Sequence, residues 1–396
     1  AGWATGQERM ALAGLVGDAV DLAEQGVPVS RQMNDVGERE RGAWAQFPSF
    51  VAQVLAEGRA PGTGSRLRLP ALAETFRRLA AEGLDSFYRG SIARDMACDL
   101  AQAGSPLTLE DFGRHRADIR PPLNLDLGSV CFFNSPPPTQ GLASLIILGL
   151  IIRLAKRPGG DMGDPANLVH CVVEATKQAL MIRKRYIADP DFMTRDPSEF
   201  LSAEHLDMLA ERISLDKALP WSPDDPAGDT VWLGVMDRWG NTVSCIQSIY
   251  HGFGSAVVLP KTGITWHNRG QGFFFSNGSA NSIGPLKKPL HTLNPAMAVF
   301  SDGRVVSYGT MGGDGQPQTQ AAILARYGLL GFSPQQSVCL PRWVIGRTWG
   351  KPSGSLKIES LFAPEVLEEL IRKGHTVEPE PPFSSLMGHA GMLVRH

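Results

Sequence analysis

Residues 229–250 contain the pattern that most restricts how this chain can fold, because they predict two strands joined by a tight turn. From 229 to 237 two sets of side chains alternate, one made of Val231, Leu233 and Val235 and the other of Thr230, Trp232, Gly234 and Met236. The turn sequence Asp-Arg-Trp-Gly-Asn follows at 237–241, and the β-branched, apolar run at 242–250 suits the returning strand. An antiparallel hairpin is therefore predicted here, and a hairpin by itself is only part of a core.

Thr230 begins this hairpin and follows a segment that predicts an exposed loop. Residues 214–229 read SLDKALPWSPDDPAGD and are rich in proline and aspartate. If the chain were cut before Thr230, the new α-amine would have an ordinary pKa of roughly 7.7–8.0. It could then accept the proton of the threonine's own hydroxyl, so that one residue supplies both nucleophile and base. Without such a cut Thr230 is an ordinary strand threonine, and the pattern alone favours that interpretation.

The rest of the chain divides into a mainly helical first part and a strand-rich second part. Apolar residues recur at three- and four-residue spacing up to about residue 213, which predicts helices at 10–26, 69–83, 142–152 and 166–189. After residue 229 we expect strands at 230–237, 242–250, 254–266, 295–300 and 304–309, and helices near 317–330 and 364–373. This order of helices and paired antiparallel strands fits an α+β fold.

Composition and charge exclude several classes of function. The formal charge of −2 and the pI near 6.6 predict no basic surface for nucleic acid or an anionic membrane. The longest apolar run, 142–152, is shorter than the roughly 20 residues that a bilayer requires. Five cysteines without CxxC spacing and nine histidines without HxH or HExxH predict neither disulfides nor a metal site. The cysteines favour a reducing compartment, the cytoplasm, with the periplasm as the alternative if a signal preceded residue 1.

Several motifs, in order along nearly the whole chain, resemble those of the γ-glutamyltransferase family of N-terminal-nucleophile (Ntn) hydrolases. They are PPPTQG at 136–141, EATKQALMIRKRYIADPDF at 174–192, the hairpin with its Asp-x-x-Gly-Asn turn, FGSAVVLPKTGITWHNR at 253–269 and GTMGGDGQPQTQ at 309–320. Members of that family cleave themselves before a threonine, use no cofactor, and fold as a four-layer αββα sandwich. The resemblance implies a cut between Asp229 and Thr230, with residues 1–229 and 230–396 remaining associated as large- and small-subunit segments of one domain. The family's arginine that holds the substrate carboxylate, in the front part of the large subunit, has no counterpart here.

The resemblance assigns catalytic roles to four residues. Thr230 becomes the nucleophile, and Gly312 and Gly313 become the oxyanion hole, in which each backbone N–H contributes roughly 3 kcal/mol. Ser248 falls where the family places a hydroxyl that hydrogen-bonds the nucleophile and assists its cleavage. The residues themselves leave other interpretations open, because a glycine pair also suits a tight turn and Ser248 also suits a buried strand serine.

Four further residues correspond to the family's donor pocket: Tyr250, Arg269, His291 and Thr292. In the transpeptidases these positions hold asparagine, glutamine and a serine pair, and Gly272 stands where an aspartate pairs with the substrate ammonium. The pocket thus loses a carboxylate that would bind a substrate ammonium and gains a guanidinium that can bind a substrate carboxylate. An acyl donor with a carboxylate near its amide is therefore expected, although Arg269 also suits a surface salt bridge.

The strings GDTVWLGVMD, IQSIYHGFGS, ITWHNRG, HTLNPA and GGDGQPQTQA are most similar to the oxamate amidohydrolase branch, which hydrolyses a very small amide of this kind. Trp232, Tyr250 and Trp266 could narrow such a pocket. Cephalosporin acylases and γ-glutamyl hydrolases or transpeptidases are the alternatives within the family, and a catalytically silent relative that only binds a small anion or a partner is the alternative outside it. We expect a small-molecule amide as substrate and neither nucleic acid nor membrane as partner, and a homodimer stays open.

Overall fold

The computed structural model of the chain describes residues 10–55, 58–221, 229–275, 279–346 and 353–396. Contacts divide the chain into two compact units, the first Ala1–Ile119 with Gly252–Asn268 and the second Arg120–His251 with Arg269–His396. The predicted segment boundary at 229/230 lies within the second unit and stays a prediction. Part of the loop predicted before it, 222–228, is outside the described residues.

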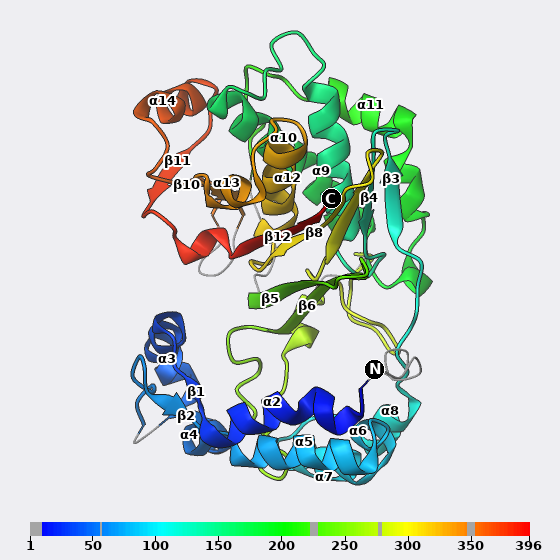
Figure 1. Cartoon of the computed structure of the whole chain (residues 1–396), viewed down its shortest axis with the longest axis vertical. Helices are drawn as coiled ribbons and strands as arrows, with labels where there is room; N and C mark the ends of the chain where they lie inside the picture. Colours follow the sequence, from blue (N-terminus) through cyan, green and yellow to red (C-terminus); the bar gives the residue numbers. More distant parts are fainter. Residues whose placement is uncertain (1–9, 56–57, 222–228, 276–278, 347–352) are drawn as a thin grey trace. The chain divides into compact units, whose positions relative to one another are not determined.

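The first unit is mainly helical (Figure 1). It encloses two apolar clusters. One cluster surrounds Trp44 and Phe50, the other Met96, and the segment 252–268 contributes Val258 to the first and Leu259 to the second. The helices predicted at 10–26 and 69–83 are confirmed as α2 and α5. The elements of this unit are α2 (Leu12–Gln25), β1 (Val27–Pro28), α3 (Arg31–Trp44), α4 (Pro48–Val54), β2 (Arg66–Leu67), α5 (Pro70–Glu82), α6 (Ser86–Arg89), α7 (Ser91–Gln102) and α8 (Leu109–Arg114).

The strand predicted at 254–266 is wrong. Gly254 and Ala256 have φ angles of 57° and 59°, in the left-handed region that a ladder does not use, and Pro260 has no N–H to donate. The segment instead makes an irregular loop with one isolated bridge between Val258 and Thr265. The apolar side chains that suggested a strand are buried in the clusters of the first unit.

A five-stranded antiparallel sheet of order β12-β8-β7-β4-β3 forms the centre of the second unit. Along β8 the side chains alternate between its two faces. Val306 and Tyr308 join the main apolar core, whereas Ser307 Oγ donates to the carbonyl of Val243 on the other face. The strands are β3 (Leu123–Asp126), β4 (Val130–Asn134), β7 (Ala296–Phe300), β8 (Val305–Thr310) and β12 (Ala390–Arg395).

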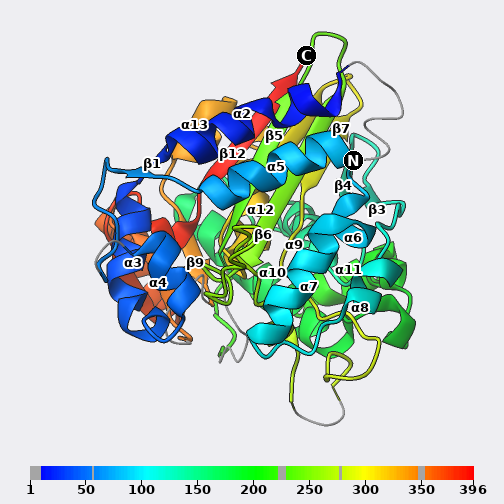
Figure 2. The ribbon, with the colours of Figure 1, turned by 90° about the horizontal axis from the view of Figure 1, so that it is seen from below.

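Helices cover one face of this sheet and a two-stranded hairpin covers the other (Figures 1 and 2). The helices are α9 (Gly141–Leu154), α10 (Pro165–Tyr186) and α12 (Gly315–Gly328), and the hairpin pairs β5 (Asp229–Met236) with β6 (Thr242–Tyr250). The helices, the five-stranded sheet and the hairpin follow the order of three of the four layers of the predicted sandwich, and the α+β fold class is confirmed.

Local sequence explains the two central helices. α9 is apolar on nearly every side, which suits a helix enclosed by others. α10 begins where the Asp164 side chain accepts hydrogen bonds from the backbone N–H groups of Ala166 and Asn167, with Pro165 as its first residue. Three basic residues occupy its last turn, where they favour the negative end of the helix dipole.

The other elements of the second unit add further helices and a separate three-stranded sheet of order β11-β10-β9. They are η1 (Pro190–Phe192), η2 (Pro197–Leu201), α11 (Ala203–Glu211), η3 (Arg269–Gly272), α13 (Pro334–Cys339), β9 (Trp343–Ile345), β10 (Leu356–Glu359), α14 (Pro364–Arg372), β11 (Val377–Glu380) and η4 (Ser385–Met387). Within the described ranges, every helix is too short or too polar to cross a bilayer. All five cysteines are free thiols.

Candidate active site

Thr230 lies at the beginning of β5, where the pairing of the hairpin is irregular. Asp229 pairs with Tyr250 but Val231 pairs with Gln247, so Thr230 alone faces two residues of β6. Bulges of this kind re-aim a side chain and are frequent beside active sites. Thr230 is half-buried, and the side chain of Asp229 is outside the part of the chain that the structure describes.

Gly312 and Gly313 form the turn between β8 and α12. Their φ angles are 122° and 51°, conformations that a residue with a Cβ rarely adopts, which explains why the turn is built from glycine. The carbonyl oxygen of Gly313 accepts hydrogen bonds from Gln140 Nε2 at 2.8 Å and from the backbone N–H of Gln316 at 3.2 Å. The turn is therefore held from two sides, and its role as an oxyanion hole stays a prediction.

The first turn of α12 brings a side chain to Thr230 that the sequence did not single out. Gln316 is fully buried, and its Nε2 lies 3.5 Å from Thr230 Oγ1. Because Gln316 follows Gly313 by three residues, this contact places the predicted nucleophile beside the predicted glycine turn. The signal available in the sequence was the repetition of glutamine in GQPQTQ at 315–320, shortly after the glycine pair.

A buried ion pair supports the glycine turn, and the sequence did not predict it. Arg183 of α10 donates through Nη1 to Asp314 Oδ1 and to Gln140 Oε1, both at 2.6 Å. The side chains of Arg183 and Asp314 are each only 3% exposed. Gln140 in turn donates to the carbonyl oxygens of Gly313 and Thr292. One network thus connects α10, the glycine turn and the 291–292 segment.

A cavity of about 20 Å³, large enough for one water molecule, lies beside this network. Its lining brings together the predicted pocket residues Tyr250 and Thr292 with Gly272, the position at which the resemblance implied the loss of an aspartate. A Cβ at Gly272 would lie 2.5 Å from the carbonyl oxygen of Leu290, so no larger residue fits there. The lining residues are Arg183, Tyr250, Gly272, Phe274, Leu290, Thr292 and Asp314.

Arg269 and His291 are neighbours of residues that line this cavity. Arg269 contacts Tyr250, and His291 directly precedes Thr292. The Arg269 guanidinium carbon is 5.0 Å from the ring centroid of Tyr250, a distance typical of a cation–π contact. Burial lowers the pKa of Arg269. Burial, and then the charge of Arg269, lowers the pKa of His291 to about 4. His291 is therefore neutral at pH 7, and Arg269 is a second guanidinium of this region besides Arg183, which pairs with Asp314.

Ser248 occupies the bulge of β6. Its Oγ accepts a hydrogen bond of 2.8 Å from the backbone N–H of Tyr250, and it thereby fixes the end of the strand. Its predicted hydrogen bond to Thr230 stays a prediction.

Trp232 and Trp266 pack against other parts of the fold. The Trp232 indole lies so close to Gly309 and Gly391 that a Cβ there would meet the ring at 2.2 and 2.4 Å. It packs the hairpin onto β8 and β12. Trp266 belongs to the first unit, where its ring is 5.9 Å from that of Phe112.

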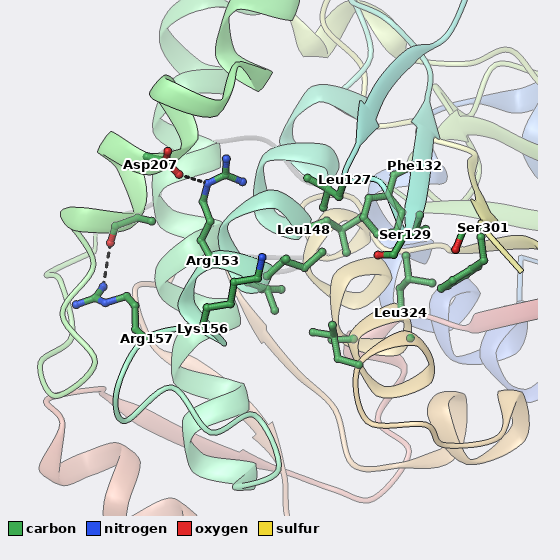
Figure 3. A pocket seen from close by; sticks show the side chains of 18 of the residues that line it. Leu127, Ser129, Phe132, Leu148, Arg153, Lys156, Arg157, Asp207, Ser301 and Leu324 are labelled. Carbon is green, nitrogen blue, oxygen red and sulfur yellow. Dashed lines mark hydrogen bonds and ion pairs between the residues drawn. The ribbon is translucent and has the colours of Figure 1, made fainter.

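A larger hollow of about 960 Å³ lies elsewhere in the second unit, between β4, α9, α11 and α12 (Figure 3). Its floor is apolar, with Phe132, Leu148 and Leu324, and an ion pair between Arg153 and Asp207 lies on its rim. None of the predicted site residues lines it. Of the predicted site residues, Tyr250 and Thr292 line the smaller cavity instead.

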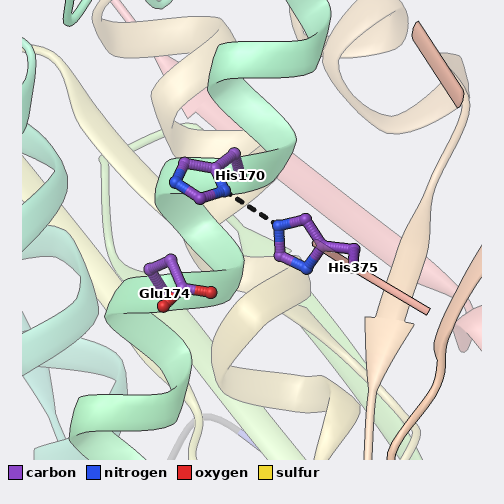
Figure 4. A group of neighbouring side chains, drawn as sticks. All are labelled: His170, Glu174 and His375. Atoms are coloured by element: carbon purple, nitrogen blue, oxygen red, sulfur yellow. Dashed lines mark hydrogen bonds between the residues drawn. The ribbon is translucent and has the colours of Figure 1, made fainter. Parts of the chain in front are cut away.

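A second buried polar group joins α10 to the segment after α14 (Figure 4). His170 Nδ1 and His375 Nε2 are 2.8 Å apart, and His170 Nε2 lies 2.9 Å from the carbonyl oxygen of Ser214. Since a carbonyl only accepts, His170 donates through Nε2–H and accepts from His375 at Nδ1. Glu174 accepts from Lys177 Nζ and from a backbone N–H. Hydrogen bonds thus account for these potential metal-ligand atoms, and the nearby ammonium groups would oppose a cation.

This histidine pair predicts a loss of stability in acid. Burial is the main cause that lowers the pKa of both histidines. The pKa of His375 falls to about 3. Unfolded histidines have a pKa near 6.5, so the unfolded state binds more protons as the pH falls below about 6.5. Above about pH 6.5 the two histidines are neutral in both states and do not change the free energy of unfolding with pH. Below that pH, each histidine lowers the free energy of unfolding by up to about 1.4 kcal/mol per pH unit. Urea unfolding between pH 7 and 4 measures this slope.

His375→Gln is the control for this prediction, because a glutamine Nε2 can still donate to His170 but does not titrate. The variant should lose stability less steeply between pH 6 and 4 than the wild type. Equal slopes for the two proteins would contradict the assignment of a neutral, buried His375.

Comparison with known proteins places the chain in a family. Residues 4–393 match the gamma-glutamyltranspeptidase family. The chain is 48% identical to an oxamate amidohydrolase proenzyme of Klebsiella pneumoniae over 97% of its own length and 72% of that protein. It is 34% identical to the glutathione hydrolase-like YwrD proenzyme of Bacillus subtilis, over 97% of the chain and 73% of that protein. A cephalosporin acylase from Bacillus halodurans superimposes with a TM-score of 0.87 at 28% identity, covering 98% of this chain and 71% of the other. The chain belongs to the gamma-glutamyltranspeptidase family.

Proposed function

We propose that this protein is a self-processing hydrolase of amide bonds with Thr230 as its N-terminal nucleophile, and that its substrate is a very small amide bearing a carboxylate, such as oxamate. The relative at 48% identity, an oxamate amidohydrolase proenzyme, supports the self-processing and the small carboxylate-bearing substrate. The observation that carries the proposal is the approach of Gln316 to the Thr230 hydroxyl, which joins the start of β5 to the glycine turn.

Self-cleavage needs only groups of this site. The Thr230 hydroxyl attacks the carbonyl carbon of Asp229, and the peptide nitrogen leaves with a proton. An ester then joins Asp229 to Thr230 Oγ1, and the α-amine of Thr230 is free. Water hydrolyses the ester and restores the hydroxyl, which leaves Thr230 at a new N-terminus.

Hydrolysis of the substrate repeats the same attack on a different carbonyl. The Thr230 hydroxyl attacks the amide carbonyl while its proton moves to the α-amine and from there to the departing ammonia. The backbone N–H groups of Gly312 and Gly313 stabilise the oxyanion. Water then attacks the acyl ester and releases the acid, which for oxamate is oxalate.

The pocket supports a small anionic donor. Arg269 supplies the positive charge beside Tyr250, and the enclosed Gly272 excludes the aspartate that would pair with a substrate ammonium. A guanidinium can bind a carboxylate through two parallel hydrogen bonds. Since the cavity holds about one water molecule, a donor of few atoms requires the least displacement of side chains.

A cephalosporin or glutaryl acylase is the second candidate. The fold similarity to the Bacillus halodurans protein, whose title names a cephalosporin acylase, favours it. Such a donor also carries a carboxylate that Arg269 could bind, but it places a longer chain beside Tyr250. The two candidates therefore differ in the length of the acyl group.

A panel of three substrates tests the proposal: ammonia release from oxamate, and hydrolysis of a glutaryl amide and of a γ-glutamyl anilide. We expect oxamate to have the highest kcat/KM, because the pocket is small and its charge is positive. Turnover of the glutaryl amide alone would favour the acylase. Turnover of the γ-glutamyl anilide alone would overturn the argument from Arg269 and Gly272, and an uncut chain without any turnover would favour a protein that only binds.

Arg269→Leu sharpens this test. Losing a hydrogen bond to a charged group costs roughly 1.5–3 kcal/mol, so kcat/KM for oxamate should fall by about 10- to 150-fold, mainly through KM. Arg269→Lys keeps the positive charge but cannot form two parallel hydrogen bonds. Its kcat/KM for oxamate should lie between those of wild type and Arg269→Leu. Both variants should still be cut before Thr230, since Arg269 has no part in that step.

A further inference from the structure

Gln316 makes a contact that the family resemblance does not assign. One atom of its side-chain amide, Nε2, faces Thr230 Oγ1 at 3.5 Å. The other, Oε1, is enclosed by protein and has no hydrogen-bond partner among the described residues. A buried polar atom without a partner is costly and rare, so it calls for an explanation. If the amide is turned over, one atom still faces the hydroxyl and the other is still enclosed.

We propose that Gln316 is a positioning residue that holds both functional groups of the processed Thr230, one with each atom of its amide. The proposal rests on the proposed function, because only the cut before Thr230 creates the second group. In the intact chain the amide meets the hydroxyl alone. After the cut, the α-amine of the same residue can donate to the enclosed Oε1, which gives that atom the partner it lacks.

The two contacts together fix the direction of proton transfer. Gln316 Nε2 donates to the threonine Oγ1, and the amine donates one N–H to Oε1. The lone pair of the amine is then directed to the hydroxyl proton that it must accept. Gln316 moves no proton itself and does not contact the acyl group, so its loss should lower kcat more than it changes KM.

The expected results follow from two variants, measured on the processed protein with oxamate as substrate. Gln316→Leu keeps the size but not the hydrogen bonds, and misplacement of reacting groups costs about 10²-fold in kcat. Gln316→Glu puts a carboxylate beside the α-amine. It favours the ammonium form and raises the pKa of the amine, so the acid limb of kcat/KM should move to higher pH by about one unit.

Gln320→Glu is the matched control, since it places the same charge one turn further along α12. Gln320 is equally buried, but its side chain makes its hydrogen bonds with Asn294 and Asn134. The acid limb should remain at the wild-type pH in this variant. An unshifted limb in Gln316→Glu, with wild type cut and active, would overturn the role of Gln316 and leave the proposed function standing. Wild type that stays uncut and inactive would overturn both.

Discussion

Thr230→Ala is expected to leave one chain of 42.8 kDa on a denaturing gel, whereas wild type separates into segments of residues 1–229 and 230–396. Alanine has no hydroxyl to attack the carbonyl of Asp229, so neither the ester nor the free α-amine can form. Hydrolysis should fall together with cleavage, because the same hydroxyl serves both. Removing a catalytic nucleophile lowers kcat by at least about 10³-fold, which ammonia release measures directly.

Thr230→Ser controls for the loss of the side chain, because it keeps the hydroxyl and removes only a methyl group. It should still give two bands and measurable turnover. The fold should be unaffected in both variants, since Thr230 is half-buried and Trp232 anchors the hairpin to the large sheet. A folded wild-type protein that runs as a single band, with the mass of the intact chain, would contradict self-processing at this position.

Most of the elements that carry strong periodicity could be predicted from the sequence. The hairpin appears as β5 and β6, and the apolar run at 142–152 as the enclosed helix α9. The segment 254–266 shows where such patterns fail, because it has the composition of a strand but a backbone of turns. The strands β3, β4 and β9 to β12 were missed. Most of them are short, and β4 and β12 pair with β7 and β8, which lie far from them in the sequence.

The candidate site was predictable only in part, and for a physical reason. The chemistry of Thr230 and the conformational freedom of the glycine pair are properties of single residues. The contact from Gln316 and the ion pair between Arg183 and Asp314 are properties of the fold. Arg183 appears in a helix next to other basic residues, which suggests a solvated face, and only its burial against the glycine turn reveals a different role.

Arg183→Met should strongly destabilise the second unit. The variant keeps an unbranched side chain but leaves the buried Asp314 carboxylate and Gln140 Oε1 without their arginine. Breaking a buried ion pair from one side costs roughly 3–5 kcal/mol, which urea unfolding measures. The matched control is Arg372→Met in the same unit, because Arg372 pairs with Glu369 on the surface of α14, where the two side chains are 65% and 31% exposed. An exposed pair contributes at most about 1 kcal/mol, and equal losses for the two variants would contradict the role of burial.

The double variant Arg183→Met with Asp314→Leu separates stability from positioning. Apolar residues of similar volume can replace a buried ion pair with little loss of stability, so unfolding should return toward the wild-type value. Turnover should not return, because Gln140 would no longer be held by Arg183 and could not fix the carbonyl groups of Gly313 and Thr292. If both stability and turnover recovered, the pair would only fill the core. Recovery of stability alone would mean that the charges are retained because they orient the glycine turn toward Thr230.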